Sequence, residues 1–156
     1  MFNVLLDPLP KEWRGYPIDY DFQIGIQISQ CFEDDSLNER EKLITALTLL
    51  FPDENNRPPL EEAQVALEWY MTDFNHDHHT GKKSERKVMD FDVDQWRIYA
   101  AFLNQYNIDL NNTKMHWFVF MGLLSNLEES SFSRVIDIRQ KKISGKMEKS
   151  EKDALL

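Results

Sequence analysis

Apolar residues recur at helical spacing in several segments of the chain, and polar or proline-containing stretches separate these segments. Spacings of three and four residues place apolar side chains on one face of a helix. The pattern predicts helices at about 37–51, 59–74, 92–106, 111–126 and 130–140. For 21–34 the alternating isoleucines allow either a strand or a helix. We favour a helix there, capped by Asp19 or Asp21.

The first twenty residues are predicted to form an extended arm, with at most one short strand. They contain three of the six prolines, and each proline removes a backbone donor and disfavours helix for the preceding residue. The arm also carries apolar residues that are costly to leave in water: Phe2, Val4, Leu5, Leu6 and Trp13. We expect the arm to pack on its own domain or on another subunit.

Local signals indicate where the helices begin and end. Ser36 followed by Glu39 matches a capping box for the helix at 37–51, and Pro59 suits the first position of the next helix. Asp90 or Asp92 can cap the helix at 92–106, and Asn107 tolerates the left-handed conformation that often follows a helix. The remaining caps are expected at Asn111 or Asn112 and at Ser130 or Ser131.

Apolar faces can be assigned for three of the predicted helices. The helix at 59–74 is expected to bury Ala63, Ala66, Leu67, Tyr70 and Phe74. The helix at 92–106 is predicted to direct one apolar face inward, formed by Val93, Trp96, Tyr99, Ala100, Leu103 and Tyr106, with Phe102 widening it. The helix at 111–126 is apolar nearly all round, which is typical of a core helix or an interface helix.

The expected fold is all-α: a compact single domain of five or six helices with an extended N-terminal arm. Its parts are the arm at 1–20, the helical domain at 21–140 and a charged C-terminal tail at 141–156, which could include a short helix at 147–156. Composition agrees, because 42% of the residues are hydrophobic and glycine is scarce, which disfavours both disorder and turn-rich all-β folds.

Charge is unevenly distributed, and this excludes one class of partner. Residues 1–75 hold 5 basic and 15 acidic side chains, a net charge of −10, whereas the rest of the chain is close to neutral. Binding to nucleic acid requires clustered basic residues on one face, so we expect no nucleic-acid partner. No apolar run is long enough to cross a membrane, and a single cysteine cannot form an internal disulfide. We therefore expect a soluble protein of a reducing cytoplasm.

Candidate catalytic and metal-ligating residues are few. His76, His78 and His79 lie among aspartates, which is ligand chemistry for zinc, but a solvated loop explains them better than a metal site or a metal-dependent hydrolase. His116 could act as a general base, yet its apolar neighbours favour a structural role. Acidic residues follow Cys31 and should raise the pKa of its thiol, which disfavours a nucleophile. We expect no enzyme activity, no cofactor and no metal.

Three segments resemble one family of phage proteins. VDQWRIYAAFLNQYNIDLNNTKMHWFVFMGLLSNL (93–127), SFSRVIDIRQKK (131–142) and DDSLNEREKLITALTLLFP (34–52) are similar, in this order, to a family encoded in tail modules of siphophages of Gram-positive bacteria. They cover more than a third of the chain. The sequence departs from the family pattern at Asn107, where glycine is expected, and at 114–118, where KMHWF replaces an LHWW-like motif.

The resemblance implies a function in phage assembly. Family members are encoded just before the tape-measure gene, which implies a tail assembly chaperone that keeps the tape-measure protein soluble in the host cytoplasm. It also implies the tail-tube protein as a further candidate partner and brings no catalytic residues. The alternative is a stoichiometric tail or connector protein of the virion.

Such a chaperone needs an apolar groove for a helical client. Our candidate partner-binding residues are Trp96, Tyr99, Trp117, Phe118 and Phe120, each of which could instead belong to the core. Many copies along one client would favour a homo-oligomer, with the arm at 1–16 as a plausible connector.

Overall fold

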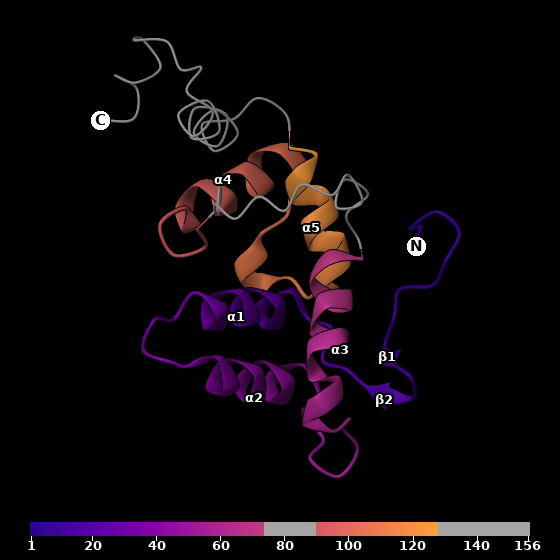
Figure 1. Cartoon of the computed structure of the whole chain (residues 1–156). Helices are drawn as coiled ribbons and strands as arrows, with labels where there is room; N and C mark the ends of the chain where they lie inside the picture. Colours follow the sequence, from indigo (N-terminus) through magenta and orange to yellow (C-terminus); the bar gives the residue numbers. More distant parts are fainter. Residues whose placement is uncertain (74–89, 128–156) are drawn as a thin grey trace, which may run out of the picture. The chain divides into compact units, whose positions relative to one another are not determined.

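The computed structural model describes residues 1–73 and 90–127, so the predictions for 74–89 and 128–156 lie outside the described residues. Within those ranges the chain is mostly helical, with five α-helices and a two-stranded hairpin (Figure 1). The all-α prediction is confirmed. The chain divides into two units, of which the first includes the N-terminal residues and 114–122, and the second includes the described residues 90–113 and 123–127.

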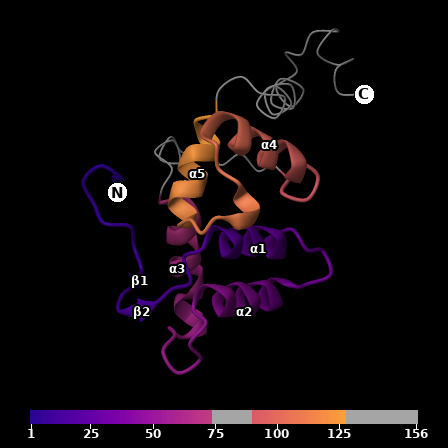
Figure 2. The same cartoon turned by 180° about the vertical axis from the view of Figure 1, so that it is seen from behind.

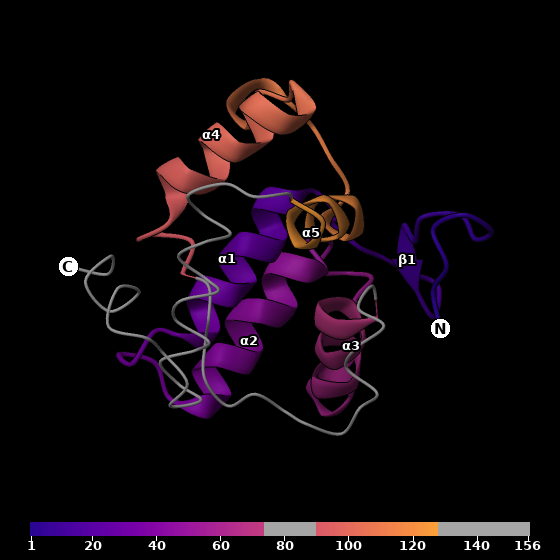
Figure 3. The same ribbon diagram turned by 90° about the horizontal axis from the view of Figure 1, so that it is seen from above.

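Three complete helices lie in the first unit: α1 (Phe22–Phe32), α2 (Glu39–Leu50) and α3 (Leu60–Thr72). α2 packs against both α1 and α3 (Figures 1 and 3). Asp21 caps α1, because its carboxylate accepts a hydrogen bond from the backbone N–H of Gln23 at 3.2 Å. This confirms the helix at 21–34 over the strand and selects Asp21 over Asp19 as its cap.

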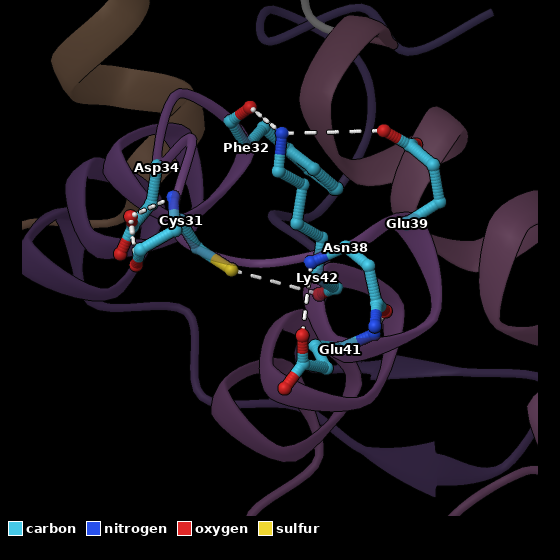
Figure 4. A network of polar contacts seen from close by, with 8 residues as sticks. Cys31, Phe32, Asp34, Asn38, Glu39, Glu41 and Lys42 are labelled. Atoms are coloured by element: carbon cyan, nitrogen blue, oxygen red, sulfur yellow. Dashed lines mark hydrogen bonds and ion pairs between the residues drawn. The ribbon is translucent and has the colours of Figure 1, made fainter.

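The capping box of α2 lies two residues later than the sequence predicts. Asn38 is the cap: its side chain accepts from the N–H of Glu41, and the Glu41 carboxylate accepts from the N–H of Asn38, at 2.8 and 2.9 Å (Figure 4). Ser36 instead donates its hydroxyl to Asp34. The prediction of a Ser36–Glu39 box was wrong because three candidate caps, Asp34, Ser36 and Asn38, lie two residues apart, and both the N–H and the hydroxyl of Ser36 are bound by Asp34.

α3 follows the prediction closely. Pro59 is its cap residue, one position before the first helical residue, and two glutamates lie in its first turn. Acidic side chains at this position stabilise a helix, because its N-terminus is the positive end of the helix dipole. The predicted inward face is buried, and it consists of Ala63, Ala66, Leu67 and Tyr70. Phe74, also predicted for this face, lies outside the described residues.

The N-terminal arm contains two short strands, one more than expected. β1 (Glu12–Trp13) and β2 (Tyr16–Pro17) pair antiparallel through a two-residue turn (Figure 2). Arg14 and Gly15 both have positive φ, 49° and 86°, which is the backbone conformation that tight hairpins require. The ring of Trp13 is buried and meets Phe51 edge-on at 6.2 Å. The arm therefore packs on its own unit at this point.

A short bridge joins the end of the arm to a distant part of the sequence. The N–H of Phe22 donates to the Met115 carbonyl and the N–H of Trp117 donates to the Tyr20 carbonyl, both at 2.8 Å. Asp21 and His116 form the intervening antiparallel bridge. These bonds hold the beginning of α5 (Trp117–Ser125) in the first unit.

α5 begins later than predicted. Asn111 and Asn112 belong to a separate 3₁₀ helix, Leu110–Asn112, which is capped by Asp109, whose carboxylate accepts from the N–H of Asn111. The prediction of one helix over 111–126 was wrong because this short helix ends at Thr113, which has extended backbone angles, before α5 starts. The prediction that this apolar helix belongs to a core is supported, since Trp117, Phe118, Phe120 and Leu124 are buried.

α4 (Gln95–Tyr106) lies in the second unit and exposes the face that the sequence predicts to be inward. It buries Ile98 and Ala101 instead, together with Phe102, which the sequence does predict to face inward. For Val93, Trp96, Ala100 and Leu103 the prediction was wrong, because the helix is apolar on two opposite sides and the pattern alone does not show which side packs on the core. Asn107 ends the helix in the left-handed conformation, with φ 56° and ψ 36°, as predicted.

Candidate functional site

An exposed row of apolar side chains runs along α4, and we name it the α4 stripe. It consists of Val93, Trp96, Ala100 and Leu103. The exposed fractions of Val93, Trp96 and Leu103 are 67%, 75% and 40%, and Ala100 is also exposed. Spacings of three, four and three residues match the a and d positions of a heptad, which form the contact seam between two packed helices.

The side of α4 opposite the stripe is buried and provides the apolar contacts that hold the helix in its unit. Ile98, Ala101 and Phe102 are buried there, together with Phe91 from the preceding turn. At about 100° per residue, this buried side lies roughly opposite the α4 stripe. The core contacts of α4 therefore leave the stripe available to a partner.

Polar contacts fix the start of α4. The N–H of Asp94 donates to the Asp90 carbonyl at 2.8 Å, and the N–H of Ile98 donates to the Asp94 carbonyl at 3.0 Å, so helical spacing extends back through Val93. The side chain of Asp94 is fully buried and pairs with Arg97 at 3.4 Å. Val93 thus takes a defined position in the stripe although it precedes the helix.

Tyr99 supports the aromatic part of the stripe from one side. Its ring meets that of Trp96 edge-on, with centroids 5.8 Å apart, and its hydroxyl donates to Asp109 at 2.8 Å. This hydrogen bond is the main reason why the pKa of Tyr99 is raised and that of Asp109 is lowered. Two of the five predicted binding residues, Trp96 and Tyr99, are therefore neighbours.

The other three predicted residues lie in the core. Trp117, Phe118 and Phe120 are 1%, 4% and 0% exposed. Trp117 and Phe120 stack at 5.9 Å, and Phe120 stacks in turn on Phe22 of α1 at 5.0 Å. Binding of a partner by these three stays a prediction, and a client would have to displace packed rings to reach them.

Trp117 packs on α1 where that helix has no side chain. A Cβ atom placed on Gly25 would overlap the six-membered ring of the Trp117 indole. Gly25 therefore provides the space in which the indole ring lies against the α1 backbone. The sequence gives no sign of this contact, because Gly25 and Trp117 are far apart in the chain.

His116 has the structural role that the sequence favours. Its Nδ1 accepts a hydrogen bond from the N–H of Phe118 at 3.0 Å and so caps the first turn of α5, while Nε2 lies 2.7 Å from the Pro10 carbonyl. An accepting Nδ1 requires the neutral ring, with the proton on Nε2 donated to Pro10. Burial lowers the pKa of His116, and the Pro10 carbonyl opposes this shift. The ring also stacks on Tyr20 at 5.1 Å.

Cys31 is not an activated thiol. Its sulfur lies 3.6 Å from the Lys42 carbonyl, and the Lys42 ammonium donates to the Phe32 carbonyl at 3.0 Å (Figure 4). Burial, and after it the charge of Asp34, raises the pKa of the Cys31 thiol. The sequence predicts this direction from the acidic neighbours but misses burial as the larger cause.

A second exposed apolar surface lies near the N-terminus. Val4, Leu5 and Leu6 are 64%, 89% and 82% exposed. Asn3 and Asp7 close the turn that carries them: the N–H groups of Leu6 and Asp7 donate to the Asn3 carbonyl, and the N–H of Asn3 donates to the Asp7 carboxylate. An ordered turn therefore presents three adjacent apolar side chains.

Sequence reasoning placed Val93, Ala100 and Leu103 in the core and so missed their part in an exposed surface. The sequence does indicate a second surface, because the helix carries two apolar series. One is the heptad series of the α4 stripe, and the other is Ile98, Ala101 and Phe102. A helix that packs on the core with one side buries only one of its two apolar faces, so the other face is exposed.

No group of three or more His, Cys, Asp or Glu side chains within 1–73 and 90–127 could hold a metal ion. His76, His78 and His79 lie outside these ranges. No helix in the same part of the chain is both long and apolar enough to cross a membrane.

Comparison with known proteins identifies the family. Neither the curated proteins nor the solved structures contain a match to the chain. Among protein families, the one described as bacteriophage Gp15 protein matches residues 5–156, which is nearly the whole sequence. The chain therefore belongs to the bacteriophage Gp15 protein family.

Proposed function

We propose that this phage protein is a non-enzymatic tail assembly chaperone, which binds the tape-measure protein in the host cytoplasm and keeps it soluble during tail morphogenesis. Membership of a bacteriophage family supports an assembly or structural role. The resemblance of residues 93–127 to proteins encoded beside the tape-measure gene supports the narrower assignment.

The α4 stripe is the observation that carries this proposal. A tape-measure protein is long and helical, so its soluble precursor exposes apolar stripes of its own. Helix-in-groove recognition uses anchors at positions i, i+3, i+4 and i+7 of a helix. Counted from Trp96, these positions on the folded helix are Tyr99, Ala100 and Leu103, and Val93 adds the position i−3. Trp96 is the expected main anchor, since tryptophan often dominates interface energies.

Solubility of the client on co-expression tests the proposal. The tape-measure protein should be mostly soluble when it is produced with the wild-type chain and mostly insoluble with Trp96→Glu, because the charge prevents burial of the stripe. Val65→Glu is the matched control: Val65 is 50% exposed on α3 and lies outside the stripe, so this variant should keep the client soluble. A client that is equally soluble without the chain contradicts the proposal.

The alternative is a stoichiometric structural protein of the tail or connector. Mass spectrometry of purified phage particles separates the two functions. A chaperone is absent from the finished particle or present only in traces, whereas a structural component appears in a fixed ratio to the tail-tube protein. The second result would replace the chaperone proposal.

Self-association also belongs to the proposal, because a long client offers binding places for many copies. The turn at 3–7 is a candidate connector between copies, since Leu5 and Leu6 are its most exposed apolar side chains. Deletion of residues 1–7 should then reduce the number of copies bound to each client without preventing binding of the first copy.

A further inference from the structure

The α4 stripe is symmetric about the middle of its own length. Val93 and Leu103 lie five residues before and after position 98, and Trp96 and Ala100 lie two residues before and after it. In an antiparallel pair of helices related by a two-fold axis, positions equally far from the centre face each other. A second copy of the stripe would therefore place Trp96 opposite Ala100, and Val93 opposite Leu103.

This pairing combines a large with a small side chain at the centre. Close packing between helices needs a space for every protruding side chain. The Trp96 indole is the largest group of the stripe and Ala100 the smallest, so each copy provides both the protruding ring and the space that receives it. A parallel pair would instead place Trp96 against Trp96 and Ala100 against Ala100, which fits poorly.

The flanks of the stripe are compatible with the same arrangement. In an antiparallel pair each flank meets the same flank of the other copy. Arg97 lies one residue before the centre, so it meets its own counterpart on one flank, where the buried carboxylate of Asp94 pairs with each guanidinium and offsets its charge. Asp92 lies near Tyr106 of the other copy. Tyr99 meets its own counterpart on the other side, where its hydroxyl is held by Asp109. Like charges across an interface would otherwise oppose association.

The geometry points to an antiparallel homodimer formed through the α4 stripe in the free protein. Its interface is small, because four residues of one short helix contribute from each copy. Interfaces at the low end of the size range are transient, so the expected dissociation constant is micromolar or weaker. Association through the stripe covers the surface that the proposed function gives to the client, and a client helix must displace the second copy.

The first experiment measures self-association of the full chain by sedimentation velocity from about 1 μM to about 500 μM, the range in which a weak dimer changes its population. The wild type should shift from monomer to dimer across this range, and Trp96→Glu should remain monomeric. Val65→Glu, which changes an exposed apolar residue outside the stripe, should dimerise like the wild type.

A size exchange tests the two-fold pairing itself. Ala100→Trp makes the stripe more apolar but places two indoles opposite each other, so it should weaken the dimer at least tenfold. Adding Trp96→Ala to this variant exchanges the large and small positions and should restore dimerisation. Both positions are exposed, so circular dichroism should show unchanged helix content in every variant. Stronger association of Ala100→Trp alone would indicate general stickiness and overturn the proposal.

Disulfide crosslinking gives the orientation. In a Cys31→Ala background, chains with Val93→Cys are mixed with chains with Leu103→Cys and oxidised. The mixture should form a covalent dimer efficiently, and each variant alone should not. Efficient crosslinking within each single variant would indicate a parallel pair and overturn the proposal.

Failure of the dimer proposal can be distinguished from failure of the proposed function. A wild type that stays monomeric at every concentration, whether its stripe is free or covered by another part of the same chain, overturns the dimer. The tape-measure protein could still depend on Trp96 for solubility in that case. The two claims therefore fail separately.

Discussion

Replacing Gly25 with alanine should destabilise the first unit, although the same change usually stabilises a helix. Gly25 lies inside α1, and the added Cβ would overlap the six-membered ring of Trp117. The ring cannot move freely, because Trp117 is only 1% exposed and stacks against Phe120. The substitution therefore forces either α1 or the start of α5 out of place.

Two opposing effects set the expected magnitude. Exchange of glycine for alanine in a helix interior contributes about 1 kcal/mol in favour of folding. Overpacking a filled core costs about 1–3 kcal/mol and occasionally more, and the rigid surroundings of Trp117 favour the upper end. The free energy of unfolding should therefore fall by about 2 kcal/mol, as measured by urea denaturation followed by circular dichroism.

A double-mutant cycle identifies the cause. Trp117→Leu removes the ring and destabilises the protein by itself, but Gly25→Ala should then cost little or even stabilise, so the two changes should couple by about 2 kcal/mol or more. Gly122→Ala is the matched control in α5, since a Cβ there meets no atom of the described residues within 4 Å. It should leave stability unchanged or raise it by up to about 1 kcal/mol. Additive effects in the cycle, or a Gly25→Ala variant as stable as the wild type, would refute the reasoning.

Three further predictions concern a buried histidine, a helix cap and a tyrosine. Burial lowers the pKa of His116 from its usual 6.5, so the unfolded chain takes up the proton first as the pH falls. The free energy of unfolding should therefore decrease below about pH 6.5, and urea denaturation should show a smaller decrease for His116→Asn, whose amide can accept from Phe118 without titrating. Asn38→Ala should destabilise α2 by about 1 kcal/mol in thermal unfolding, and Ser36→Ala should cost less, because Asn38 is the cap. Tyr99→Phe should raise the pKa of Asp109 in an NMR titration, and an unchanged value would mean that the Tyr99 hydroxyl does not hold this carboxylate.

Much of the helical architecture could be predicted because the signals are local. The Asp21 cap, the inward face of α3 and the left-handed Asn107 depend on residues within a few positions of each other. The cap of α2 was missed by two residues, because Asp34, Ser36 and Asn38 all have side chains that can accept from nearby N–H groups, and only their competition decides which one caps.

The candidate site could not be predicted from residue spacing alone. Both apolar series of α4 have helical periodicity, so the sequence cannot tell which side packs on the rest of the protein. The cap of α5 also depends on distant residues, since His116 is held between Pro10 and Phe118. The ring contact between Trp96 and Tyr99 follows from their spacing of three residues on one helix, whereas the burial of Trp117 depends on a glycine in another helix.

The central claim is that the α4 stripe binds the tape-measure protein, and affinity purification from infected or co-expressing cells tests it most directly. The tagged wild-type chain and the Val65→Glu control should retain the tape-measure protein in amounts measurable by quantitative mass spectrometry. The Trp96→Glu variant should lose at least nine-tenths of it, the tenfold drop that loss of about 1.4 kcal/mol of binding energy produces. Equal retention by Trp96→Glu and the wild type would contradict the claim.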